Sequence, residues 1–173
     1  MDSAVLASLL VGALALIFAF YKASWISKLN PGNDRMKEIS NYIHEGSMAF
    51  LTREYKSLAI FVVVLFVVLA FVINIQTALC FLLGAIFSVI AGYVGMQSAT
   101  KANVRTANAA MESGMTKALN VAFSGGAVMG MVVVGLGIIG VSAVYFVYGE
   151  PNIITGFGLG ASSIALFARV GGG

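Results

Sequence analysis

Charged residues are scarce in this sequence. They make up 10% of its 173 residues, whereas hydrophobic residues make up 60% and the mean hydropathy is +0.96. A water-soluble domain carries roughly 25% charged residues. So few charges do not cover a water-facing surface, and this excludes an ordinary soluble domain. A lipid bilayer is therefore the expected solvent for most of the chain.

Cysteine, proline and histidine are also rare. One cysteine and two prolines exclude a disulfide-bonded scaffold. Cys80 lies in an apolar run, which favours a buried packing thiol over a metal ligand or a nucleophile. His44 lies among polar residues with no second histidine or cysteine nearby, and we interpret it as a solvated surface residue. We expect no metal site within this chain.

The residue patterns of common catalytic sites are missing. The sequence has no pair of carboxylates for acid–base catalysis and no Gly-x-x-x-x-Gly-Lys phosphate loop. No acidic residue lies deep in an apolar run, although a proton or sodium pathway normally needs an ionisable group within the membrane. Arg169, near the end of the last apolar run, is the sole candidate. From the residues alone, its side chain is expected to reach the nearby membrane interface.

Apolar runs long enough to cross a bilayer, which takes about 20 residues, dominate the sequence. The run over residues 58–95 is too long for one crossing, and the polar residues 74–77 divide it into two helices joined by a tight turn. Turn-forming residues 149–152 separate the last two runs. The predicted fold class is an all-α membrane protein with five transmembrane helices, at residues 4–21, 57–73, 77–96, 123–148 and 153–169.

Basic residues lie on one side of these five helices. The only charged residues on the opposite side are Asp2 and Glu150. By the positive-inside rule, the N-terminus is non-cytoplasmic and the C-terminal end is cytoplasmic. The acidic Asp2 before the first run also indicates a retained helix instead of a cleaved signal peptide. The net charge of +3 is then a topology signal, and no nucleic-acid partner is expected. The ten basic residues are Lys22, Lys28, Arg35, Lys37, Arg53, Lys56, Lys101, Arg105, Lys117 and Arg169.

Residues 33–55 have the spacing of an amphipathic helix. Apolar residues recur at three- and four-residue steps from Met36 to Leu51, with polar residues on the other faces. Asn33 or Asp34 is expected to cap the first free N–H groups. We interpret this segment as a cytoplasmic helix at the membrane interface that runs into the second membrane helix. Docking on a larger partner domain is the competing interpretation.

Small residues recur four positions apart within the predicted membrane helices. Lipid gives little hydrophobic drive for helix association, so such residues usually mark faces where two backbones approach closely. A Gly-x-Gly-x-x-Ala pattern that starts at Gly156 resembles a dinucleotide-binding loop, but no strand precedes it and it lies within a membrane helix. The predicted helix-packing residues are Gly84, Ser88, Gly92, Gly126, Gly130, Gly156 and Gly160.

Three segments, in order along the chain, resemble landmarks of one protein family. They are RMKEISNYIHEGSMAFL (residues 35–51), GMQSATKANVRTANAA (residues 95–110) and ALFARVGGG (residues 165–173). The family is the membrane-integral, ion-pumping inorganic pyrophosphatases, whose members are much longer. The resemblance implies that residues 1–173 are the N-terminal part of a single larger membrane domain.

The resemblance also implies an activity. Family members work as homodimers, hydrolyse pyrophosphate with Mg²⁺ on the cytoplasmic side, and pump protons or sodium ions outward, some of them with K⁺ dependence. In the family, the groups that hold magnesium pyrophosphate belong to the sixth and later helices. We therefore expect this chain alone to be inactive, with the bilayer and the remainder of the pump as its partners.

By the same resemblance, Arg169 matches the arginine of the coupling gate in the ion pathway. In the family it acts with an aspartate and a lysine from later helices. Gly171, Gly172 and Gly173 match the start of the cytoplasmic turn to the sixth helix.

Two alternatives belong to other classes of protein. One is a small stand-alone membrane transporter or channel, and the other is a non-catalytic membrane scaffold. An oligomeric rotor subunit is a variant of the first, but it needs a mid-membrane carboxylate, which the apolar runs lack.

Overall fold

The chain folds into five long helices and, over the described part, no strand. The computed structural model describes the backbone of residues 3–172 and the side chains of residues 3–168. The predicted all-α class is therefore confirmed. In chain order the helices are α1 (Ser3–Lys28), α2 (Asp34–Val72), α3 (Ile75–Ser113), α4 (Met115–Tyr148) and α5 (Pro151–Gly172).

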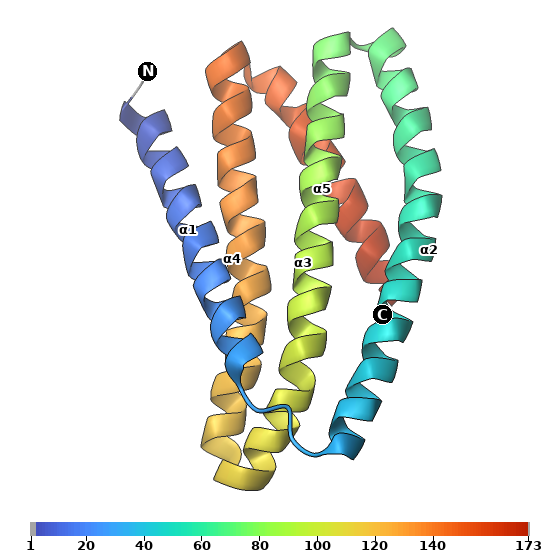
Figure 1. Cartoon of the computed structure of the whole chain (residues 1–173). Helices are drawn as coiled ribbons and strands as arrows, with labels where there is room; N and C mark the ends of the chain where they lie inside the picture. The colour runs from blue at the N-terminus through green and yellow to red at the C-terminus, as the bar shows by residue number, and fades with distance from the viewer. Residues whose placement is uncertain (1–2, 173) are drawn as a thin grey trace.

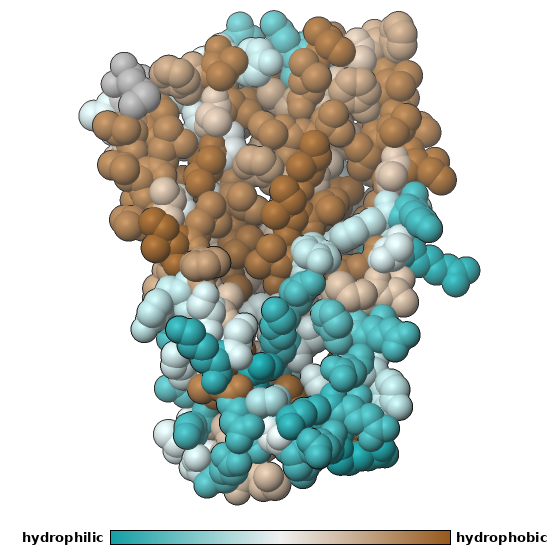
Figure 2. Space-filling model, viewed as in Figure 1, coloured by the Kyte–Doolittle hydropathy of each residue, from teal (hydrophilic) through white to brown (hydrophobic). Residues whose placement is uncertain are grey.

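All five helices have the length and apolar character that a membrane span requires. Hydrophobic side chains cover the upper part of the molecule in Figure 2, and hydrophilic side chains cover its lower end. The lower end carries the α1–α2 loop and the α3–α4 turn (Figure 1). The apolar part is long enough for a bilayer, and the polar part extends beyond it into water.

Two polar segments are helical. The amphipathic helix predicted at residues 33–55 runs into the second membrane helix as expected, because it continues without a break into the rest of α2 (Figure 1). The polar residues between the third and fourth apolar runs are also helical, and Gly114 alone separates α3 from α4. The physical reason is composition, since these segments contain no proline and many good helix formers.

Local signals set several helix ends. The Asn33 side chain accepts a hydrogen bond from the Met36 N–H, which confirms the cap predicted at this position. Asn74 does the same for the Thr77 N–H at the start of α3, across 2.7 Å. Gly149 ends α4 in the left-handed region with φ 67°, which glycine adopts without strain. These caps end or begin the helices sharply and keep the connections between them short.

The central helix is α3, which contacts each of the other four. In Figure 1, α1, α4, α3 and α2 stand side by side, and α5 crosses obliquely behind α3. Several of the most buried large side chains, among them Phe81 of α3, Val128 of α4 and Ile164 of α5, belong to these packed contacts. Many large apolar side chains elsewhere remain exposed, as expected for helices that face lipid or further protein.

Candidate functional site

The crossing of α3 and α5 brings the two backbones into direct contact. A Cβ atom added to Gly156 would lie 2.5 Å from the Thr77 carbonyl oxygen. A Cβ added to Gly160 or to Gly84 would come still closer to a backbone carbonyl oxygen, that of Phe81 or Phe157 respectively. Only glycine fits at such a distance. These glycines therefore fix where α5 crosses α3.

The other predicted packing residues differ among themselves. Ser88 is half-buried, and a Cβ on Gly92 would lie 3.0 Å from the Tyr55 hydroxyl of α2. Gly126 and Gly130 are exposed, with no described atom within 4 Å of an added Cβ. No described helix covers these two glycines, and their packing against a helix stays a prediction.

Other glycines make the contacts of α4. Gly140 packs against the Phe157 ring of α5, and Gly125 packs against Ala102 of α3. Gly12 of α1 lies against Gly135 of α4, where an added Cβ on Gly12 would lie 3.1 Å from the Gly135 carbonyl oxygen. Sequence reasoning missed these residues because it selected a neighbouring face of α4 and did not apply the four-residue spacing to α1.

The C-terminal part of α5 lies beside α2 (Figure 1). Ile164 is buried in a cluster with Leu58 of α2 and Ala85 of α3. One turn further on, the Phe167 ring packs edge-on against the Phe61 ring of α2, with centroids 4.9 Å apart. The last described side chains of α5 are therefore held by α2 as well as by α3.

Arg169 belongs to the last turns of α5, but its side chain lies outside the described residues. The predicted end of the helix at this position differs from the structure, because Gly171 and Gly172 continue α5. The predicted cytoplasmic turn is therefore not found at these two glycines, and Gly173 lies outside the described residues. Glycine is conformationally permissive and can adopt helical backbone angles, so the chain can continue α5 through Gly172.

An acidic residue that sequence reasoning missed lies on the inner face of α2. Glu54 is spaced three residues after the buried Leu51 and four before the buried Leu58. Its Oε2 atom is buried and has no hydrogen-bond partner among the described atoms. The next residue, Tyr55, donates a hydrogen bond to the Val89 carbonyl oxygen of α3, across 3.1 Å. The spacing from Leu51 and Leu58 was the signal that would have identified Glu54.

The remaining candidate ligands do not gather into a metal site. Among the described residues, no three His, Cys, Asp or Glu side chains lie close enough to hold a metal ion. Cys80 is buried in an apolar cluster with Val144, Ile153 and Phe157, as expected for a packing thiol. His44 is partly buried instead of fully solvated, because its Nδ1 lies 3.4 Å from the Thr100 hydroxyl of α3.

Comparison with known proteins decides the family. A family model described as inorganic H⁺ pyrophosphatase matches residues 13–173. This chain belongs to that family. The match covers the later part of α1 and all of α2 to α5, including the α3–α5 crossing, so the pyrophosphatase family is assigned over nearly the whole described fold.

Individual relatives of this pyrophosphatase-family chain are named as ion pumps. A Clostridium tetani protein named as a K(+)-stimulated pyrophosphate-energized sodium pump is 61% identical over 174 residues. K(+)-insensitive pyrophosphate-energized proton pumps from Methanosarcina mazei and Pyrobaculum aerophilum are 45% and 38% identical. Each alignment covers 100% of this chain but 26% of the relative. The chain thus spans about a quarter of the length of these relatives.

Proposed function

We propose that this chain is part of a membrane pump that couples hydrolysis of pyrophosphate to outward transport of protons or sodium ions. The family match over residues 13–173 is the observation that carries the proposal. The pump names of the aligned relatives and the five apolar helices support it. The relatives include a sodium pump and proton pumps, so the proposal covers both ions.

By the family resemblance, α1 to α4 would lie at the periphery of such a pump, and α5 would be the first of the helices that surround its catalytic site. Within this chain, α5 crosses α3 with backbone contact and reaches α2 through Phe167. These contacts fix the position of α5 against α2 and α3. We propose that α5 thereby holds Arg169 in place for a role in the coupling gate. The remainder of the pump and a second subunit of a homodimer are the proposed protein partners.

Mg²⁺ does not fit the described residues of this chain, because they form no cluster of metal-ligating side chains. We therefore place the ligands of magnesium pyrophosphate in the remainder of the pump. K⁺ stimulation is part of the name of the Clostridium tetani relative, and its determinants are proposed to lie outside this chain as well.

The first prediction concerns catalysis by the chain alone. The purified 173-residue chain is expected to release no phosphate from magnesium pyrophosphate above the uncatalysed rate. Phosphoryl transfer depends on metal ions and electrostatic positioning of the charged group, and the described residues provide no carboxylate cluster. A phosphate-release assay checks this. Mg²⁺-dependent turnover that a substitution such as Glu54→Gln abolishes would contradict it.

The second prediction concerns topology. Cysteines introduced at Met115, in the α3–α4 turn, and at Asn152, at the start of α5, are expected to react from opposite sides of the membrane. Both positions are exposed and uncharged, whereas Gly149 has a left-handed backbone that disfavours substitution. Cys80 is 3% exposed and gives little background. Met115→Cys should react from the cytoplasm, and labelling of both positions from one side would refute the orientation.

A further inference from the structure

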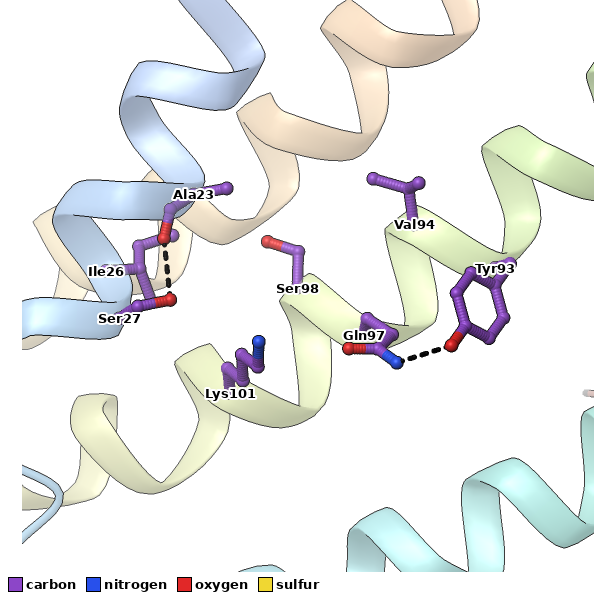
Figure 3. Close-up of a pocket in the computed structure, with 8 residues that line it drawn as sticks. All are labelled: Ala23, Ile26, Ser27, Tyr93, Val94, Gln97, Ser98 and Lys101. Carbon is purple, nitrogen blue, oxygen red and sulfur yellow. Dashed lines mark hydrogen bonds between the residues drawn. The ribbon is translucent and has the colours of Figure 1, made fainter.

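A cavity of about 370 Å³ lies between α1 and α3, at the depth where both helices leave their apolar segments. Ala23 and Ile26 of α1 form one wall. The polar side chains of Tyr93, Gln97, Ser98 and Lys101 line the α3 side (Figure 3). α1 and α3 contact each other weakly, so the space between them is not filled by protein.

Ser98 and Lys101 give the cavity its chemical character. Ser98 is 6% exposed, and its buried hydroxyl has no hydrogen-bond partner among the described atoms. In Figure 3 this hydroxyl points from α3 toward α1. Lys101 lies one turn away and forms no salt bridge with a described residue, and no carboxylate lines the cavity. A site with one uncompensated positive charge and an unpaired hydroxyl favours an anion with several acceptor oxygens.

A second donor borders the same space. The Gln97 side-chain amide donates a hydrogen bond to the Tyr93 hydroxyl oxygen across 2.8 Å (Figure 3). The Tyr93 hydroxyl therefore keeps its own hydrogen for another acceptor. The Ser27 hydroxyl of α1, by contrast, already donates to the Ala23 carbonyl oxygen. The free donors thus come from α3.

The lower end of the cavity is fixed by Arg105. Its guanidinium donates to the Leu29 and Ser27 carbonyl oxygens at 3.1 and 3.2 Å, which ties the end of α1 to α3. Arg105 also donates to the Lys101 carbonyl oxygen of its own helix at 2.8 Å. These bonds occupy one N–H on each of the three guanidinium nitrogens, so Arg105 holds the two helices in position, and the Lys101 ammonium remains available to a ligand.

An exposed apolar stripe leads from these polar groups toward the middle of the apolar region. Leu79, Ile86 and Ile90 of α3 are 47%, 46% and 44% exposed. Ile86 and Ile90 precede Tyr93 by seven and three residues, so they share its helix face. A ligand with an anionic head at Lys101 would therefore lay a hydrocarbon tail along this stripe.

We propose that the α1–α3 cavity binds the phosphate group of an anionic phospholipid from the leaflet on the basic side. Lys101 provides the charge, Ser98 and Tyr93 provide hydrogen-bond donors, and Ile90 and Ile86 contact an acyl chain. The volume lies within the range of small-ligand sites, about 300–1,000 Å³, and a basic residue at this depth attracts anionic lipid. The bound lipid would add a second link between α1 and α3, beside the Arg105 hydrogen bonds. This inference goes beyond the proposed pump function and does not depend on it.

Native mass spectrometry of the protein in detergent, with added phosphatidylglycerol, tests the proposal. We compare the wild type with the Ser98→Ala and Lys101→Gln double variant, and with Lys56→Gln as the matched charge control. Lys56 is an exposed lysine of α2 at the start of an apolar segment, and it does not line the cavity. The double variant should bind the first phosphatidylglycerol about tenfold more weakly, the size expected for losing charge-assisted contacts. Lys56→Gln should bind like the wild type.

Two further arms distinguish the ligand classes. Phosphatidylcholine should bind the wild type more weakly than phosphatidylglycerol, and millimolar inorganic phosphate should not displace bound phosphatidylglycerol. Equal loss of binding in Lys56→Gln and the double variant, or no loss in either, would overturn the proposal. Displacement by inorganic phosphate would overturn it in favour of a free-phosphate site. Ser98→Ala alone, which keeps all charges, guards against misfolding of the double variant and should show a smaller loss.

Discussion

Replacing Gly160 with alanine is expected to lower the thermal unfolding midpoint of this chain by about 2–12 °C. The added Cβ would meet the Phe81 carbonyl oxygen of α3 closer than 3.0 Å, and backbone cannot move aside as a flexible side chain can. Overpacking of this kind costs about 1–3 kcal/mol, and for a chain of this size each kcal/mol shifts the midpoint by about 2–4 °C. The backbones of α3 and α5 must separate to accept the methyl group.

Gly158→Ala is the matched control for this substitution. Gly158 lies two residues away in the same helix, with no described atom within 4 Å of an added Cβ. Alanine there should be neutral or slightly stabilising, because glycine is the poorer helix former. A thiol-reactive fluorophore reads the unfolding, since Cys80 is the sole cysteine and is buried beside α5. Equal midpoints for the two variants would refute the close crossing of α3 and α5.

Replacing Arg169 with alanine in a full-length pump should reduce ion transport per hydrolysed pyrophosphate by at least about tenfold. A tenfold change corresponds to about 1.4 kcal/mol in the free energy that favours the coupled reaction. We propose that Arg169 pairs with a carboxylate from another helix. A guanidinium stays charged at every working pH, so it holds such a carboxylate ionised until the pair is broken. Burying an unpaired charge costs several kcal/mol, and the partner would therefore be left in an unfavourable state.

The Arg169→Lys variant separates the effect of the positive charge from the effect of the guanidinium shape. Lysine keeps the positive charge but loses the two-pronged guanidinium, so pumping should fall at least as much as hydrolysis does. Arg53 of α2 is exposed, and Arg53→Ala serves as the control for loss of one arginine. Transport and phosphate release are measured together in vesicles that contain the full-length protein. Wild-type transport per pyrophosphate in Arg169→Ala would remove Arg169 from the coupling gate and restore the interpretation of an arginine at the membrane interface.

Much of the fold follows from local features of the sequence. Apolar length defines the membrane helices, because about 20 apolar residues need a bilayer-sized hydrocarbon layer. Asn33, Asn74 and Gly149 end or begin helices through contacts with their own neighbours, which any single segment can display. The polar extensions of α3 and α4 were harder to predict, since composition alone does not separate a polar helix from a polar loop.

The candidate site was predictable only in part. The spacing of Gly84, Gly156 and Gly160 indicated faces suited to close packing, and the structure places these three residues at one crossing. The same spacing at Gly126 and Gly130 marked a face that no described helix covers. A repeat of small residues shows that one face of a helix lacks bulky side chains. It carries no information on whether another helix lies against that face. Arg169 was singled out by its position near the end of an apolar run, and only the resemblance to the family motif suggested a role in the coupling gate.

The sequence by itself therefore determined the number of helices, their ends at the capping residues, and the one-sided distribution of basic charge. Each of these depends on residues that are close along the chain or on their affinity for lipid. The tertiary structure alone decided which glycines touch a backbone, that the Glu54 Oε2 atom has no hydrogen-bond partner among the described atoms, and that Ser98 and Lys101 share a cavity with α1. These features depend on how helices far apart in the sequence are placed against one another, and that placement comes from the packing of the whole bundle.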